Sequence, residues 1–327
     1  MIKAHINAIS YITPSKAFTN DDLVKEFPEW SIDKVASKVG ITNRYIAKDE
    51  ESTSDLAVMA SEKLFTEHNI NRDIIDLVLL CTQSPDYTLP TTACIIQDRL
   101  GLKTSCGAFD FNLGCSGYAY GLAIAKGFIE SKIAQNILLI TSETYSKYLS
   151  KDDKSNRTIF GDAASATLIS NKGFASIEDF VLGTDGSGAD NLIVRNSGSK
   201  KDLNQSDKLY MNGAEIYNFT LKSVPKLVEG IIDKNKIINS EVDLFILHQA
   251  NMFMLSHLRK KIRINQEKFY TYMDKVGNTV SSTIPIALYH ALKEKRIKNK
   301  DKVLIAGFGV GYSWGGTILK FNDYKTL

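Results

Sequence analysis

Two pairs of apolar segments repeat along this 327-residue chain at almost the same spacing. Residues 75–83 resemble residues 242–249, displaced by 167 positions, and residues 136–140 resemble residues 302–306, displaced by 166. Each segment is a short continuous apolar run bounded by polar residues or glycine, which is typical of a strand buried on both faces. A spacing of about half the chain indicates an internal duplication.

Segments with a helical pattern alternate with these runs, at residues 54–67, 91–100, 117–131, 214–233 and 284–293. This alternation predicts an α/β fold in which helices cover a buried sheet. We expect an N-terminal half over residues 1–172 and a C-terminal half over residues 173–327. The two halves need not be separable domains.

The composition is ordinary for a soluble globular protein, with 43% hydrophobic and 24% charged residues. The net charge of +3 is too small to argue for nucleic-acid binding. Residues 1–14 hold no apolar core of signal-peptide length, and no apolar run approaches the roughly 20 residues of a membrane span. We therefore expect a cytoplasmic protein without nucleic-acid or membrane partners.

The four cysteines, Cys81, Cys94, Cys106 and Cys115, match no CxxC or zinc-ligand spacing, so no metal site is predicted. Cytoplasmic thiols are normally reduced. Cys81 ends an apolar strand and Cys94 lies in a helix-like segment, so both are expected in the core.

Cys115 lies on a short turn between a strand-like run at residues 108–111 and a helix-like run at residues 118–125, with glycines on both sides. Such a turn is expected to expose the sulfur and to aim the positive end of the helix dipole at it. Both effects favour the thiolate, which is the nucleophilic form. Taken alone, however, a single cysteine before a helix is more often a small core residue.

His248 and Asn278 stand in comparable settings in the second half. His248 follows a buried strand, a suitable place for a catalytic imidazole, although a core histidine explains it equally well when it is taken alone. Asn278 alone reads as a helix cap or turn residue. Because sites form at the carboxyl ends of strands, two related halves would bring Cys115, His248 and Asn278 towards one crevice.

A glycine-rich run occupies residues 307–316. It contains no GxGxxG register, and too few residues follow it for the βαβ unit of a dinucleotide site. Dense glycine can instead let backbone N–H groups approach a substrate oxygen, as an oxyanion hole requires. Phe160-Gly161-Asp162 is interpreted as a tight turn into a strand, and Asp162 is not expected to take part in chemistry.

In this order and setting, the motifs around Cys115, His248, Asn278, Phe160 and the glycine-rich run resemble those of the β-ketoacyl-acyl carrier protein synthase III family, in the thiolase-like superfamily. The similarity extends from residue 6 to residue 321. It implies a five-layer αβαβα thiolase-like fold made of two pseudo-duplicated halves, and a homodimer. It also implies acyl-CoA as a substrate, an acyl carrier protein as a partner, and no metal or other cofactor.

The resemblance implies a reaction in two stages. Cys115 attacks an acyl-CoA thioester and becomes acylated, while the N–H groups of Cys115 and Val310 hold the oxyanion. Malonyl-acyl carrier protein then loses carbon dioxide, and its enolate, stabilised by His248 and Asn278, attacks the acyl group. This role demands a neutral imidazole beside an apolar wall.

The resemblance also implies substrate contacts, which are Trp30, Leu89, Arg157, Phe160 and Gly309. Trp30 resembles the adenine-stacking residue of the family, but the following segment is longer here, whereas Arg157 matches the other adenine contact better. Leu89 replaces the phenylalanine that acetyl-specific members commonly place in the wall that the dimer partner adds to the acyl pocket. The smaller side chain predicts a longer or branched acyl group.

The basic residues with which the family docks its carrier protein are replaced by Asn218 and Phe253. A substitute patch is available at Arg259, Lys260, Lys261 and Arg263. The same residues are equally consistent with a solvated helix face.

Three alternative functions remain open. The first is an acyltransferase that passes the Cys115-bound acyl group to an O, N or S acceptor without decarboxylation. The second is a hydroxymethylglutaryl-CoA synthase-like enzyme with Glu143 as general acid, against which the shorter chain and the sequence after His248 argue. The third is a catalytically silent scaffold that binds an acyl carrier. The sequence identifies neither the acyl primer nor the pathway.

Overall fold

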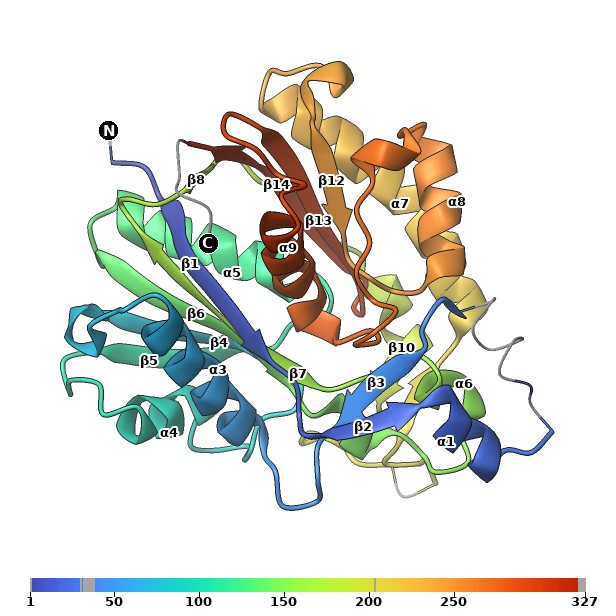
Figure 1. Ribbon diagram of the computed structural model, residues 1–327. Coiled ribbons are helices and arrows are strands. Elements are labelled where there is room, and N and C mark those ends of the chain that lie inside the picture. Colours follow the sequence, from blue (N-terminus) through green and yellow to red (C-terminus); the bar gives the residue numbers. More distant parts are fainter. Residues whose placement is uncertain (1, 30, 32–38, 203, 323–327) are drawn as a thin grey trace.

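The computed structural model describes residues 2–29, 31, 39–202 and 204–322 (Figure 1). The four repeated segments form strands β4 (Leu77–Cys81), β6 (Asn136–Glu143), β12 (Leu244–Leu247) and β13 (Lys302–Gly309). All are buried along their length, except for the half-buried first residue of β6 and of β13. The sequence therefore predicted these strands correctly.

The strands join into one ten-stranded sheet in the order β12-β13-β14-β8-β1-β7-β6-β4-β5, with β9 paired to β14. The remaining members are β1 (His5–Ile12), β5 (Gly107–Phe111), β7 (Ala163–Ser170), β8 (Ala175–Ile177), β9 (Val181–Thr184) and β14 (Ser313–Phe321). Two small sheets pair β2 (Lys16–Thr19) with β3 (Asn43–Ile46), and β10 (Leu192–Val194) with β11 (Leu209–Met211).

The pairing pattern of the first half recurs in the second. In the first, β4 runs parallel to β6, which is antiparallel to β7, which is antiparallel to β1. In the second, β12, β13, β14 and β8 repeat this series, and the two series meet where β1 pairs with β8. This repetition explains why the similar apolar segments of the sequence lie about half the chain length apart. The division at residues 172 and 173 falls between β7 and β8 and stays a prediction.

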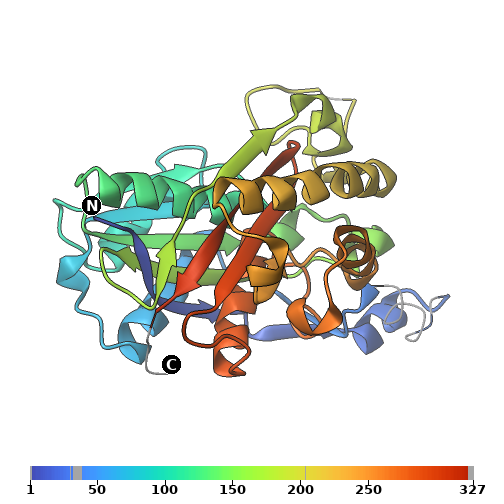
Figure 2. The ribbon, with the colours of Figure 1, turned by 90° about the horizontal axis from the view of Figure 1, so that it is seen from above.

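The helices complete five layers. The first half is covered on its outer side by α3 (Thr53–Glu67) and α4 (Thr92–Arg99), and the second by α7 (Gly213–Lys234) and α8 (Met252–Ile262). Between the halves lie α5 (Gly117–Glu130) and α9 (Thr283–Lys293), each of which contacts strands of both. Figure 1 shows α3 and α4 at the opposite end of the molecule from α7 and α8, and Figure 2 shows α7 lying across the strands of the second half. The short helices are α1 (Asn20–Glu26) and α6 (Lys154–Arg157).

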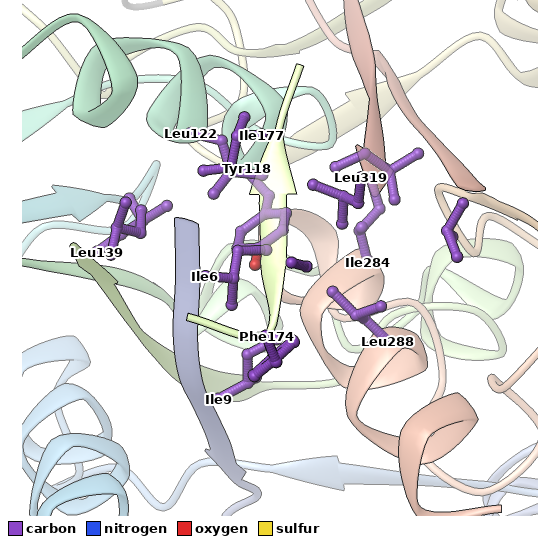
Figure 3. Close-up of a cluster of buried hydrophobic side chains, with 14 of the residues drawn as sticks. Ile6, Ile9, Tyr118, Leu122, Leu139, Phe174, Ile177, Ile284, Leu288 and Leu319 are labelled. Carbon is purple, nitrogen blue, oxygen red and sulfur yellow. The ribbon is translucent and has the colours of Figure 1, made fainter. Parts of the chain in front are cut away.

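One hydrophobic core joins the two halves. Figure 3 shows Tyr118 and Leu122 of α5 and Ile284 of α9 among side chains of β1 and β14, and Tyr118 is fully buried. Helices that pack against both series of strands give the halves a shared interior, because each central helix buries apolar surface on two sides. The halves are therefore parts of one folded unit.

The prediction for the cysteines is correct for Cys81, which is buried, and wrong for Cys94, which is exposed. Helix α4 buries Ala93 and Ile96 against the sheet. Cys94 lies on its outer face, which a helical pattern alone did not reveal.

Close backbone approach between β13 and the turn at Cys115 yields a test of the fold. In a Gly307→Ala variant, the added Cβ atom would lie 2.5 Å from the backbone oxygen of Cys115 and 2.8 Å from Cα of Ser116. We expect the free energy of unfolding to fall by about 1–3 kcal/mol, the usual range for overpacking, and the Tm to fall with it.

Gly127→Ala is the matched control. Position 127 lies within α5, and apart from its chain neighbours and the backbone of its own helix no atom lies within 4 Å of the added Cβ. The free energy of unfolding of this variant should rise by about 0.5–1 kcal/mol, because alanine is the better helix former. Equal shifts of Tm in the two variants would contradict the close approach at Gly307.

Candidate active site

A cavity of about 150 Å³ brings together the buried residues Cys115, His248 and Asn278. Cys115 comes from the turn between β5 and α5, His248 follows β12, and Asn278 precedes α9. We call this space the thiol cavity. The sequence predicted that these three residues meet in one crevice at the ends of strands. The structure places all three side chains in the wall of the thiol cavity.

Cys115 is more deeply buried than the sequence predicted. Only 7% of its surface is exposed, and burial raises the pKa of the thiol to about 12, with a further contribution from Glu143. The N-terminus of a helix stabilises a thiolate by about 0.3–1 kcal/mol. Full burial can raise a thiol pKa by about 3 to 5 pH units, and each unit corresponds to about 1.4 kcal/mol, so burial outweighs the helix. The prediction of an exposed thiolate is therefore wrong, and the resting group is a neutral thiol.

Two backbone donors act on this thiol. The N–H groups of Cys115 and Val310 both hydrogen-bond the sulfur and oppose the rise of its pKa. Val310 follows β13, and a Cβ atom at Gly309 would lie only 2.9 Å from the Cys115 sulfur. The glycine of β13 therefore lets a backbone N–H reach the reacting atom, which is the geometry that an oxyanion hole needs.

His248 is held as a neutral imidazole. Its backbone N–H donates to the carbonyl oxygen of Ala306 at 2.8 Å, which continues the pairing of β12 with β13. Burial lowers the pKa of the ring to about 3. The ring of Phe308 stands edge-on at 5.6 Å. The neutral ring and the apolar wall match the demand stated from the sequence.

Thr283, which the sequence analysis missed, contacts the edge of this imidazole at Nδ1. Its Oγ1 lies 2.7 Å from Nδ1 of His248 and 3.1 Å from the carbonyl oxygen of Val280. A hydroxyl has one proton, so Thr283 donates either to the carbonyl or to Nδ1, and the imidazole proton then lies on Nδ1 or on Nε2 respectively. The position of Thr283 five residues after Asn278 is the signal that could have revealed it.

Asn278 presents its amide nitrogen as a donor. Its Oδ1 accepts a hydrogen bond from the N–H of Val280 at 2.9 Å, which leaves Nδ2 for another partner. Its backbone bonds Ile159 and Gly161 in a β-bridge beside Phe160, which fixes it from the other side. Asn278 is not a helix cap, because Ser282 occupies that position for α9.

Two buried carboxyl groups lie outside the thiol cavity. Asp162 accepts hydrogen bonds from the N–H groups of Ala47 and Ser146, and burial raises its pKa to about 6. The segment leads into β7 as predicted, but the expected tight turn is not found there, because Phe160 forms a β-bridge with Asn278. Glu143 accepts from Ser84 and Ser281, and burial raises its pKa to about 8. A carboxyl group enclosed in this way is poorly placed to act as a general acid on a substrate.

The residues predicted to bind substrate are dispersed. Phe160 and Gly309 line the thiol cavity. Leu89 is 81% exposed and lies on the surface. Arg157 pairs with Glu26, and its guanidinium lies over the ring of Phe18 at 5.2 Å. Trp30 lies outside the described residues.

Of the replaced docking residues, Phe253 on α8 is 54% exposed and stacks edge-on against His257. Arg259, Lys260 and Lys261 form the last turn of α8, and Arg263 follows it. Within the described part of the chain, no helix could cross a membrane, and no group of three or more His, Cys, Asp or Glu side chains could hold a metal ion.

Comparison with known proteins identifies the family. Residues 109–186 match the family described as 3-oxoacyl-[acyl-carrier-protein (ACP)] synthase III, and residues 232–321 match its C-terminal family. The beta-ketoacyl-[acyl-carrier-protein] synthase III of Clostridium perfringens is 37% identical over 98% of this chain and 100% of the relative. The chain belongs to the β-ketoacyl-[acyl-carrier-protein] synthase III family. The resemblance stated from the sequence is thereby confirmed.

Solved synthase III structures have the same fold. A crystal structure of a 3-oxoacyl-(acyl-carrier-protein) synthase III shares 44% identity and a TM-score of 0.92, covering 98% of this chain and 100% of the other. The synthase of Burkholderia xenovorans is 36% identical, with a TM-score of 0.92 and coverage of 98% and 94%. The five-layer thiolase-like fold is confirmed.

The buried thiol predicts how Cys115 responds to pH. Because its pKa is raised to about 12, the thiolate fraction and the rate of alkylation by iodoacetamide should keep rising from pH 7 to 10, and the rise should be less than tenfold per pH unit where Glu143 ionises near pH 8. Peptide mass spectrometry measures the rate, and the exposed Cys94 reports reagent activity in the same digest. A plateau near pH 8 would show instead that the resting group is a thiolate.

A Glu143→Gln variant is the matched comparison. Ionised Glu143 raises the pKa of Cys115, but burial keeps this carboxyl protonated up to about pH 8. The variant should therefore be alkylated at the wild-type rate below pH 8 and faster above it.

Proposed function

We propose that this chain catalyses the decarboxylative condensation of a Cys115-bound acyl group with malonyl-acyl carrier protein. Its family is one of condensing enzymes of the acyltransferase class, which supports the proposal. The observation that carries it for these residues is a single cavity lined by a thiol, a neutral imidazole and an amide donor. Neither cofactor nor metal enters the steps proposed below.

In the first stage the sulfur of Cys115 attacks the carbonyl carbon of an acyl-CoA. The new C–S bond forms first and gives a tetrahedral oxyanion, the bond to the CoA sulfur then breaks as this oxyanion collapses, and the thiol proton ends on the departing CoA thiolate. The N–H groups of Cys115 and Val310 stabilise the oxyanion that forms in between. When Thr283 donates to Val280, Nε2 of His248 is unprotonated and can carry the proton across.

In the second stage the malonyl thioester loses carbon dioxide, and the electron pair of the broken C–C bond becomes an enolate. Nδ2 of Asn278 and, when Thr283 donates to Nδ1, Nε2–H of His248 donate to its oxygen. Neutral donors suit this step, because an imidazolium would protonate the carbanion. The carbanion attacks the acyl carbonyl, and Cys115 leaves as a thiolate that takes up a proton.

The proposed enzyme acts in the cytoplasm as a homodimer, with acyl-CoA and acyl carrier protein as its partners. The exposed Leu89 supports the dimer, because it lies on the surface of its own chain and is available to a second copy. The basic end of α8 supports carrier-protein docking, since an acidic partner would be attracted to Arg259, Lys260, Lys261 and Arg263.

A Cys115→Ser variant tests the nucleophile. Intact mass measured after incubation with acyl-CoAs should show an adduct on the wild type and none on the variant, and condensation should fall about a thousandfold or more. A folded variant that still turns over at the normal rate would refute the mechanism.

His248→Ala and Asn278→Ala test the second stage separately. Both variants should still form the acyl adduct on Cys115, while release of carbon dioxide from malonyl-acyl carrier protein falls by about 10²–10³, as for loss of one oxyanion donor. Release of carbon dioxide also separates condensation from a simple acyl transfer to an O, N or S acceptor. Condensation at the wild-type rate in either variant would remove that residue from the scheme.

A further inference from the structure

An unusual backbone conformation occurs two residues after Asn278. Val280 has a φ of +54°, in the left-handed region, and only 1% of its surface is exposed. The other non-glycine residues with positive φ in the described part of the chain are exposed asparagine, lysine or arginine. A β-branched residue is strongly disfavoured in this region, so the contacts around Val280 must hold it there.

This conformation orients the side chain of Asn278. The N–H of Val280 donates to Oδ1 of Asn278, and the amide nitrogen is thereby left for the thiol cavity. The terminal torsion of an asparagine is broad, so without this bond the oxygen and the nitrogen of the amide could exchange places. An amide oxygen facing the cavity would repel an enolate oxygen instead of stabilising it.

A hydrogen bond from the other half of the chain anchors the residue next to Val280. Oγ of Ser281 donates to Oε1 of Glu143, the last residue of β6, at 3.0 Å, and both residues are buried. Glu143 is itself fixed, because the backbone N–H of Gln83 and the hydroxyl of Ser84 donate to its Oε2 at 3.1 and 3.0 Å. The carboxyl group therefore gives Ser281 a rigid point of attachment.

Two further contacts close the same turn. Oγ of Ser282 lies 2.7 Å from Oγ1 of Thr141 on β6, and Oγ1 of Thr283 lies 3.1 Å from the carbonyl oxygen of Val280. A strained conformation persists where the surrounding structure fixes it in several ways at once. Of these contacts, the one made by Ser281 is attached directly to the peptide that follows Val280.

Glu143 has no place in the two reaction stages described above, because it does not line the thiol cavity. Burying a carboxyl group is unfavourable unless its hydrogen bonds compensate. Glu143 spends one of those bonds on the turn that carries Asn278, which belongs to the other half of the chain. This contact gives the buried carboxyl group a function at a distance from the reacting atoms.

We propose that Glu143 and Ser281 are positioning residues for the second stage. Their hydrogen bond holds Val280 in the left-handed conformation and so directs the amide nitrogen of Asn278 towards the enolate oxygen. The inference rests on the proposed function and assigns two further residues to its decarboxylation step.

A Ser281→Ala variant tests the inference, because it removes one oxygen and leaves Asn278 in place. Release of carbon dioxide from malonyl-acyl carrier protein should fall about tenfold or more, though less than in Asn278→Ala, since the amide is then misplaced and not absent. Intact mass should show the acyl adduct forming on Cys115 within about twofold of the wild-type rate, because the thiol and the N–H of Val310 lie outside the turn.

A double variant shows whether Ser281 acts through Asn278. In the Asn278→Ala background, Ser281→Ala should lower the release of carbon dioxide no further, because the amide that it positions is gone. A merely structural role would lower the rate by the same factor in both backgrounds.

Three control variants bear on Glu143. Ser84→Ala removes the other hydroxyl that bonds this carboxyl group but leaves the turn intact, so release of carbon dioxide should stay at the wild-type rate. Glu143→Gln resembles the carboxyl group that is protonated at neutral pH and keeps a hydrogen bond to Ser281 in either orientation of its amide, so it should retain decarboxylation. Glu143→Leu cannot form this bond and should match Ser281→Ala.

The outcomes separate the inference from the proposed function. If the wild type releases carbon dioxide from malonyl-acyl carrier protein and Ser281→Ala does so equally fast, the function stands and the inference fails. If Ser281→Ala slows adduct formation and decarboxylation equally, or adds its effect to that of Asn278→Ala, Ser281 has a structural role only and the inference again fails. If the wild type itself releases no carbon dioxide, both fail together.

Discussion

Strand β13 and the turn that carries Cys115 pass each other with no room for a side chain between them. A Cβ atom at Gly307 would collide with the backbone of the turn, and one at Gly309 with the sulfur itself. This approach brings the N–H of Val310 to the thiol, and the backbone bond from His248 to Ala306 holds the imidazole beside the same strand. Both halves of the chain contribute to the contact, so the site exists only where the duplicated units meet.

At neutral pH the ionisable groups around the reacting thiol carry no charge. Burial keeps Cys115 protonated, His248 deprotonated and Glu143 protonated. The first full charge in the site is therefore the one created by the reaction. Fixed N–H and amide dipoles can stabilise such a charge without having to reorganise.

Much of the fold, and the meeting of Cys115 with His248, could be predicted from the sequence for a physical reason. Continuous apolar runs identify strands buried on both faces, and chemistry collects where such strands end, so Cys115 and His248 could be brought together from spacing alone. Periodicity does not report depth, and the burial of the thiol and the exposure of Cys94 were therefore mispredicted. Thr283 could not be found in this way, because its contact with His248 joins residues that are 35 positions apart in the sequence.

The shared interior in Figure 3 also bears on how such a protein can change over time. After a duplication, two copies would ordinarily be free to drift apart. Here Tyr118 of the first half and Ile284 of the second belong to the same buried cluster, so a change of volume at one alters the packing around the other. The two halves differ in chemistry, since one supplies the thiol and the other the imidazole and the amide. Their shared interior nevertheless requires that changes in one half be compatible with the packing of the other.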